Sequence, residues 1–285
     1  MTAGPRSIAL GKPALLEFRG PDAVRFLNGQ ITQDVRLLAG GRITLPSCVT
    51  DAKGRLQFRI WITEAEDGVI RVEGPADSAE ALEARLTRYL IADDVEVSDL
   101  TGKWSLAHIA GDAPEAPAGV MVRASARYGA PAADWWIPEG SSIKLPDGME
   151  SLEGDALETF RIARGVPAWG RELTEGILPP EAGLEATDIS YQKGCYIGQE
   201  VISRIKSARK LNKRLARLVI DASIPVGGTV LTDREGNPAG NLTSVAPLAD
   251  GGLRHALGFL RRDSAEELFL DAPDGSRHPV LRTLG

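Results

Sequence analysis

Alternating hydrophobic and polar positions predict several β-strands in the first 110 residues. The clearest is 56–62, where Leu56, Phe58, Ile60 and Ile62 alternate with Gln57, Arg59 and Trp61, the two-residue period of a strand. The turn Asp51-Ala52-Lys53-Gly54 joins it to a shorter strand at 47–49. Further strands are predicted at 8–18, interrupted by Gly11-Lys12-Pro13, and at 69–72, 95–97 and 104–109.

Helical spacing of apolar residues occurs between these strands. Residues 76–91 place Leu82, Leu86 and Leu90 on one face. Gly20-Pro21-Asp22 opens a short helix that Gly29 can end, and 155–164 is a helix followed by Gly165. Strands and helices mixed in this order are typical of an α+β layer. Residues 111–150 and 170–190 show no regular pattern.

The pattern changes after residue 210. Short strands alternate with Gly, Pro and Asp turns and predict a small β-barrel or sandwich; they lie at 215–220, 228–231, 242–245, 256–260, 268–270 and 279–281. We therefore expect two regions, an α+β region at 1–208 and a C-terminal β-barrel at 209–285.

Composition excludes several classes of protein. The chain of 285 residues has 43% hydrophobic and 25% charged residues, as soluble globular proteins do. Two cysteines and three histidines give neither a disulfide framework nor a metal cage. Phosphate-loop, dinucleotide-binding and common hydrolase motifs are absent. With no membrane-spanning apolar run and no leader pattern at 1–20, we expect a cytoplasmic protein without a membrane partner.

Positive charge is concentrated in one stretch. The net charge of −6 argues against direct nucleic-acid binding, yet 204–217 contains seven Lys and Arg residues and no Asp or Glu. A solvated linker face explains such a run. An anion-attracting rim explains it too, and would suit a folate polyglutamate tail, a nucleic acid or an acidic partner protein.

The residues best suited to a reactive site lie at 193–200, with the sequence K-G-C-Y-I-G-Q-E. In an extended segment Lys193 and Cys195 would point to the same face. A nearby cation and the start of a helix, here a helix-like run at 199–205, both favour a thiolate. Free cysteines also commonly fill space in a core, so a reactive and a structural role for Cys195 both stay open. Cys48 is expected to be a small buried residue.

The 193–200 block resembles the signature of the YgfZ family, whose fold is related to the T-protein, the aminomethyltransferase of the glycine cleavage system. Three more segments match in order along the chain: F-L-N-G-Q-I-T-Q-D-V at 26–35, D-A-K-G-R at 51–55 and R-I-A-R-G-V-P at 161–167. The resemblance implies two intertwined α+β subdomains and a C-terminal β-barrel around a channel that binds tetrahydrofolate.

The resemblance also implies a function. It is the support of iron–sulfur cluster assembly or repair in client enzymes, including tRNA-modifying enzymes, with partners among iron–sulfur carrier or client proteins. Cys195, with Lys193, would be the functional pair, and a single thiol would hold a cluster only transiently, shared with a partner. Residues expected to bind the folate-type ligand are Gly194, Tyr196, Gly198, Gln199, Glu200, Arg204, Arg161, Thr32 and Asp34. Arg161 is equally placed to pair with Glu158.

Two departures from the T-protein bear on chemistry. Phe58 and Arg59 stand where it has an acidic pair, and Ala163 stands where it has the glutamate that grips the pterin. Without the acidic pair, aminomethyl transfer lacks its acid–base group. A tetrahydrofolate-dependent one-carbon transferase is therefore the alternative, and a non-enzymatic regulatory or RNA-associated module is a second one.

Overall fold

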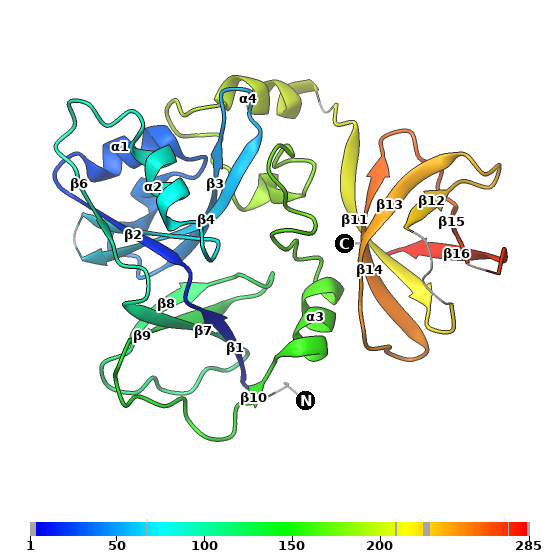
Figure 1. Ribbon diagram of the computed structural model, residues 1–285, viewed down its shortest axis with the longest axis horizontal. Coiled ribbons are helices and arrows are strands. Elements are labelled where there is room, and N and C mark those ends of the chain that lie inside the picture. Colours follow the sequence, from blue (N-terminus) through cyan, green and yellow to red (C-terminus); the bar gives the residue numbers. More distant parts are fainter. Residues whose placement is uncertain (1–3, 67, 209, 225–228, 273, 284–285) are drawn as a thin grey trace. The chain divides into compact units, whose positions relative to one another are not determined.

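The computed structural model describes residues 4–66, 68–208, 210–224, 229–272 and 274–283 (Figure 1). They divide into two compact units: unit 1 comprises 1–152 with 184–204, and unit 2 comprises 153–183 with 205–285. Both units draw on separated stretches of the chain. The domain division predicted at residue 209 stays a prediction, because that residue lies outside the described ones.

Unit 1 contains two five-stranded sheets. One has the strand order β3-β4-β5-β2-β6 and the other β10-β1-β7-β9-β8. The strands of the first are β3 (Thr44–Thr50), β4 (Leu56–Glu66), β5 (Val69–Gly74), β2 (Ala14–Arg19) and β6 (Glu96–Asp99). Those of the second are β10 (Glu150–Ser151), β1 (Arg6–Gly11), β7 (Trp104–Ala110), β9 (Ala132–Pro138) and β8 (Met121–Ser125). The apolar stretch 8–18 is thus two strands, one in each sheet.

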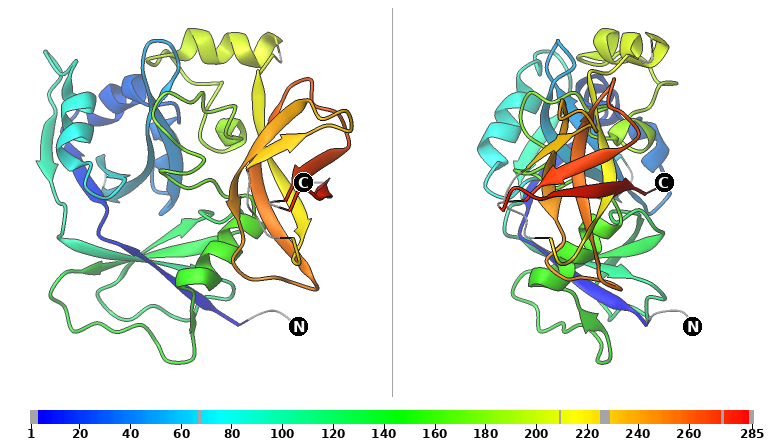
Figure 2. Two further views of the ribbon diagram at one scale, coloured as in Figure 1. Left: turned by 45° about the vertical axis from the view of Figure 1, so that its right-hand side comes forward. Right: turned by 90° about the vertical axis from the view of Figure 1, so that its right-hand side faces the viewer.

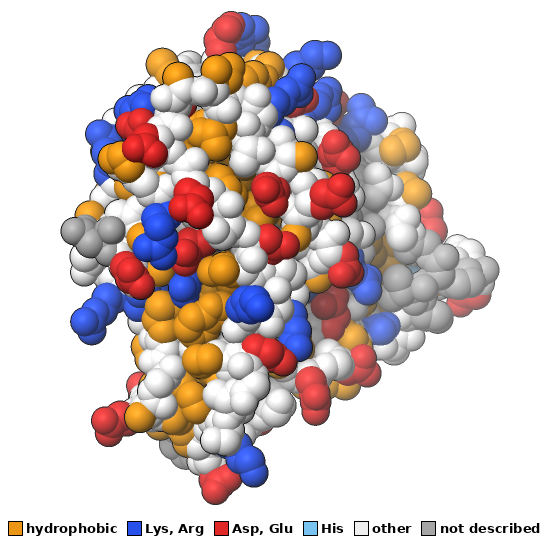
Figure 3. Space-filling view, turned by 60° about the vertical axis from the view of Figure 1, so that its left-hand side comes forward, with side chains coloured by type: hydrophobic (Ala, Val, Ile, Leu, Met, Phe, Trp, Pro, Cys, Tyr) orange, Lys and Arg blue, Asp and Glu red, His pale blue; other side chains and the backbone are white. Residues whose placement is uncertain are grey.

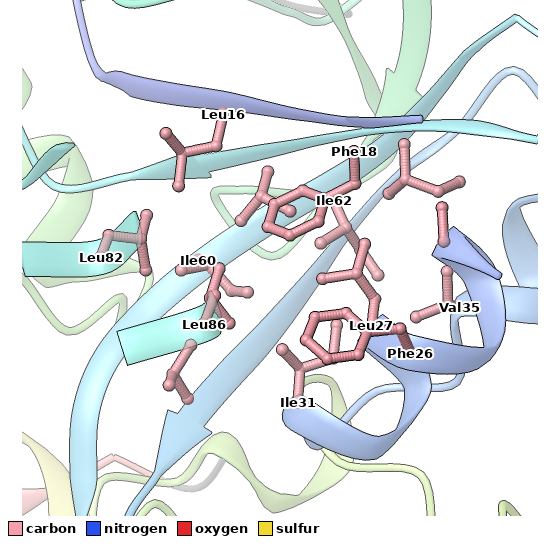
Figure 4. Packing of buried hydrophobic residues seen from close by; sticks show 14 of the residues in the cluster. Leu16, Phe18, Phe26, Leu27, Ile31, Val35, Ile60, Ile62, Leu82 and Leu86 are labelled. Carbon is pink, nitrogen blue, oxygen red and sulfur yellow. The ribbon is translucent and has the colours of Figure 1, made fainter. Parts of the chain in front are cut away.

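The main core of unit 1 lies between the first sheet and two helices, α1 (Ala23–Gln30) and α2 (Ala79–Thr87). Ile60 and Ile62 of β4 are fully buried, as their alternation predicted. Figure 4 shows Phe18 and Ile62 pointing toward Phe26 and Leu27 of α1. This packing fixes the end of α1 and the β3–β4 hairpin, which are the two supports of the cysteine motif.

Short helices complete unit 1. They are the 3-10 turns η1 (Val35–Leu38) and η2 (Leu184–Ala186) and the first part of α4 (Gln199–Ala208). The α4 helix begins within the motif, and its residues from Ile205 onward are assigned to unit 2. In the described part of the chain, no helix is long and apolar enough to cross a membrane.

Unit 2 is the predicted barrel, and it closes. Its strand order is β11-β14-β13-β12-β15-β16, shown in yellow to red in Figures 1 and 2. The strands are β11 (Lys213–Asp221), β14 (Leu253–Arg261), β13 (Pro238–Val245), β12 (Val230–Thr232), β15 (Leu268–Asp271) and β16 (Arg277–Arg282). Inside the barrel lie apolar side chains such as Leu218, Leu231 and Leu270.

One helix, α3 (Gly154–Ala163), packs on the outside of this barrel. Its Ile162 is buried with Leu257 of β14 and Ala246. Arg161 donates to Glu158, to Glu172 at 3.0 Å and to the Ser244 hydroxyl at 3.0 Å. The local pairing of Arg161 with Glu158 is therefore confirmed, and this arginine ties the helix to the barrel wall.

Candidate functional site

Cys195 is the exposed thiol of the chain, and Cys48 is buried. The motif around Cys195 runs without regular structure from residue 193 until α4 begins at Gln199. Cys48 lies in β3 with no exposed surface, and burial raises the pKa of its thiol well above the ordinary value, with Asp188 adding to that effect. Of the two thiols, Cys195 is therefore the one that solvent reaches.

Lys193 does not share a face with Cys195, so that expectation is wrong. The side chain of Lys193 is 6% exposed, whereas Cys195 is on the surface. Its ammonium group donates to the backbone carbonyls of Ile31 at 2.9 Å and Gln33 at 2.6 Å. The Lys193 side chain points inward, where its ammonium group supplies the hydrogen-bond donor for these two carbonyls after α1.

Burial also changes the acidity of Lys193. Its pKa falls to about 7, chiefly through loss of solvation; Asp34 opposes the fall and Arg36 adds to it. The Nζ atom lies 5.3 Å from the centre of the Tyr196 ring. Lys193 thus acts as a tie between the motif and the segment after α1.

That segment, 31–34, carries a dense polar network. Thr32 has no exposed surface; its hydroxyl donates to the Asp188 carbonyl at 2.6 Å and accepts from the Cys48 N–H at 2.9 Å. The Asp34 carboxylate accepts from the N–H and the guanidinium of Arg36. Hydrogen bonds from Arg36 lower the pKa of Asp34, although burial opposes this. The polar groups of Thr32 and Asp34 are thereby used within the fold.

Tyr196 and Gly198 hold the other half of the motif. Tyr196 is 7% exposed and packs with Ile189 and Ile202 in a small apolar cluster. Its hydroxyl is buried and has no hydrogen-bond partner among the described residues. Burial raises its pKa. Among the buried side-chain nitrogen and oxygen atoms of residues 193–200, this hydroxyl is the one that the described residues leave without a hydrogen bond.

Gly198 is where the backbone of the motif meets the β3–β4 hairpin. Its φ is +88°, and a Cβ added there would lie 2.5 Å from the Asp51 carbonyl oxygen and 2.8 Å from the Thr50 hydroxyl. The Thr50 hydroxyl donates to the Ile197 carbonyl at 2.6 Å. Only glycine fits this backbone conformation and this approach.

The remaining predicted ligand residues differ in their surroundings. Gly194 is exposed, with open space around a Cβ added to it, so it makes no close backbone approach. Gln199 is half-buried at the start of α4. Glu200 and Arg204 are exposed and pair with each other at 2.5 Å, one helical turn apart. Arg161 lies in unit 2, among the partners described above.

Sequence reasoning missed a buried ion pair next to this network. Arg59 of β4 pairs with Asp188, whose side chain has no exposed surface, at 3.1 Å. Burial raises the pKa of Asp188, and Arg59 opposes the rise. No sequence signal marks this pair, because its members are 129 positions apart and Asp188 lies in a segment without periodicity.

Comparisons with known proteins agree with this picture. Residues 212–280 match the family described as CAF17, C-terminal beta-barrel domain. The chain is 28% identical over 229 residues to the tRNA-modifying protein YgfZ of Serratia proteamaculans, covering 73% of this chain and 68% of that one. It is 26% identical over 250 residues to the mitochondrial iron-sulfur cluster assembly factor IBA57 homolog of Cryptococcus neoformans, covering 75% of this chain and 66% of that protein, just under two thirds.

A solved structure shares the whole fold. The glycine cleavage system aminomethyltransferase T from Bartonella henselae superposes with a TM-score of 0.81 at 19% identity, covering 100% of this chain and 86% of that one. This likeness confirms the α+β fold with a C-terminal barrel that the sequence predicted. The chain is a homologue of the YgfZ and IBA57 proteins, with the T-protein fold and a CAF17-type C-terminal β-barrel.

Proposed function

We propose that this protein supports the assembly or repair of iron–sulfur clusters in client enzymes, including tRNA-modifying enzymes, through Cys195. The observation that carries the proposal is the contrast within the motif. Lys193, Tyr196 and Gly198 are held in the fold, while the thiol of Cys195 is exposed to solvent. A thiol on a fixed support suits contact with a metal centre on another protein.

The cluster would be cargo shared with a partner. Among the described residues, no group of three or more His, Cys, Asp or Glu side chains is placed to hold a metal. A cluster needs about four ligands. Cys195 would supply one, and an iron–sulfur carrier, a client protein or a small thiol would supply the others.

A tetrahydrofolate-type molecule is the proposed small ligand, and the T-protein fold supports it. The residues do not fit one-carbon chemistry, however. The acidic pair is missing at Phe58 and Arg59, and Arg59 is paired with Asp188. Thr32, Asp34 and Arg161 have their polar atoms engaged within their own units. We therefore derive no chemical step through folate and do not favour the aminomethyltransferase alternative.

We further propose a cytoplasmic location and no direct contact with nucleic acid, so that effects on tRNA arise through the modifying enzymes. The net charge of −6 supports this view against the RNA-associated alternative.

The test is complementation in cells that lack the protein. The readout is the product of a cluster-dependent tRNA-modifying enzyme, measured by mass spectrometry of tRNA nucleosides. Cys195→Ser should fail to restore the modification, and Cys48→Ser should restore it as the unaltered protein does. Full restoration by Cys195→Ser would refute the proposal.

A further inference from the structure

Unit 2 carries a strongly basic groove along its barrel. The cavity has a volume of about 630 Å³ and is lined by β11, the end of β14 and the end of β16. Six Lys and Arg side chains line it, and none of its described lining residues is Asp or Glu; the six are Lys213, Arg214, Arg217, Arg261, Arg262 and Arg282. By contrast, the face shown in Figure 3 has acidic and basic side chains interspersed.

Two of these cations are placed directly opposite each other. Lys213 of β11 faces Arg261 of β14 in the antiparallel ladder, and both are exposed. Like charges at facing positions of a sheet destabilise it. Asp263 lies 3.6 Å from Arg261 and relieves one of the two charges in part. An anion bound across the pair would relieve both.

The groove is not purely polar. Its floor includes Leu211 and Leu260, which are buried, and Leu215 and Ala216, which are half-buried. Both apolar and cationic side chains therefore line the groove.

A second hollow adjoins the groove and shares Lys213 and Arg261 with it. This cavity has a volume of about 540 Å³, and part of its wall is apolar, formed by Ile177, Val230, Pro238 and Phe259. Val230 is 49% exposed, so this apolar side chain is accessible to a molecule in the hollow. The basic groove thus continues into an apolar hollow within the same unit.

These features favour a protein segment over a nucleic acid. A phosphate backbone would use the cations but would leave the apolar hollow uncovered. The aromatic ring in the hollow, Phe259, has the Lys213 Nζ atom 4.6 Å from its centre. One face of that ring is therefore occupied, which leaves it poorly suited to the base stacking that single-stranded nucleic acids use.

We propose that the groove and the adjoining hollow bind an extended segment of a partner protein that carries both acidic and apolar side chains. The carboxylates lie among the six cations, and an apolar side chain enters the hollow beside Val230. This inference goes beyond the proposed function and does not depend on Cys195.

The test measures binding of labelled probes to the full chain by fluorescence anisotropy. One synthetic peptide alternates Glu or Asp with Leu or Val. A second has the same acidic residues with Ser at the apolar positions and stands in for any polycarboxylate, including a polyglutamyl tail. The third probe is an oligouridylate of equal charge. We expect the alternating peptide to bind about tenfold more tightly than either of the others, with affinity falling as salt rises.

Variants locate the binding. Arg214→Glu combined with Arg262→Glu should weaken the alternating peptide about tenfold or more. Lys103→Glu combined with Lys144→Glu makes the same change in net charge outside the groove and should have little effect. Val230→Ser should weaken only the alternating peptide, by about threefold. Cys195→Ser should bind as the unaltered protein does, which separates this inference from the proposed function.

Hydrogen exchange of the unaltered protein gives a second readout that needs no variant. The alternating peptide should protect amides of β11 and β12. Equal affinity for the alternating and serine peptides would overturn the inference, as would tighter binding of the oligouridylate. An equal loss of affinity in the groove and control variants, or unchanged exchange in β11, would overturn it as well.

Discussion

Gly198 of the cysteine motif lies backbone to backbone against Gly54 of the β3–β4 hairpin. A Cβ on Gly198 would come within 2.9 Å of the Gly54 Cα, and one on Gly54 would lie 3.3 Å from the Gly198 carbonyl oxygen. Two glycines 144 positions apart thus allow the motif to rest directly on the hairpin. Gly54 lies in the 51–55 segment and Gly198 in the 193–200 block, and their contact explains why both positions require the smallest residue.

Gly198→Ala should destabilise the protein by about 2 kcal/mol or more, because it combines left-handed backbone with a close approach to a carbonyl oxygen. Gly194→Ala is the matched control: the added methyl group meets open space, so the cost should stay below about 1 kcal/mol. Urea unfolding followed by circular dichroism measures both. Equal losses in the two variants would contradict the backbone contact.

Alkylation should distinguish the two thiols. In the folded protein iodoacetamide should modify Cys195 and leave Cys48 unmodified, because Cys48 is fully buried and burial raises its pKa. Mass spectrometry of tryptic peptides after timed labelling reads this directly, and labelling in guanidinium shows that both peptides are detectable. Labelling of Cys48 at the rate of Cys195 in the folded state would show that the burial is wrong.

Lys193 should make stability depend on pH. Its pKa is about 7 in the folded protein and near 10.5 when unfolded, so the unfolded chain holds an extra proton between these values. The full penalty applies below pH 7, and stability should rise as the pH increases toward 10.5, by about 1 kcal/mol per pH unit.

Lys193→Met removes this titration. Between pH 7 and 10.5 the unfolding free energy of the unaltered protein should therefore rise relative to that of the variant. Lys103→Met, at an exposed position, should keep the pH dependence. Parallel pH profiles for the unaltered protein and Lys193→Met would show that the lysine titrates normally.

The Arg59–Asp188 pair should show strong coupling. Arg59→Met alone leaves a carboxylate with no exposed surface and should cost about 3 kcal/mol. Adding Asp188→Leu should recover much of that loss, because the buried charge is then removed as well. A double-mutant cycle from denaturant unfolding measures the coupling, and additive losses would show that the two residues act independently.

The protein should not release ammonia from an aminomethyl donor in the presence of tetrahydrofolate. The stretch 54–59 has no carboxylate to assist the transfer, and Arg59 is engaged by Asp188. A coupled ammonia assay with a T-protein as the positive control tests this. If the unaltered protein releases ammonia and Cys195→Ser does so as well, the one-carbon transferase would be favoured instead.

The sequence predicted the elements whose buried residues are apolar. The β4 strand and the barrel strands were found because their buried positions are hydrophobic and recur with the spacing of a strand. The β8 strand was missed for the opposite reason: Arg123 and Ser125 are its buried residues, and Val122 is exposed. The β9 strand was missed because Trp135 and Trp136 are both buried, on opposite faces, so no alternation remains.

At the site, the motif located the exposed thiol but not the surroundings of Lys193. Its partners are the backbone carbonyls of Ile31 and Gln33, about 160 positions away, and a carbonyl leaves no mark in a sequence. The ligand roles predicted for Gly194, Gln199 and Glu200 stay predictions, as no ligand contact bears on them.

The buried position of Lys193 shows that residues of the 193–200 block differ in their contact with the fold. Lys193, Tyr196 and Gly198 attach the loop to the fold, whereas the thiol of Cys195 is exposed. A descendant that lost the thiol would therefore keep the loop, the fold and an easily recognised signature. A match to the attachment residues alone therefore indicates the architecture, and the function proposed for Cys195 requires the cysteine as well.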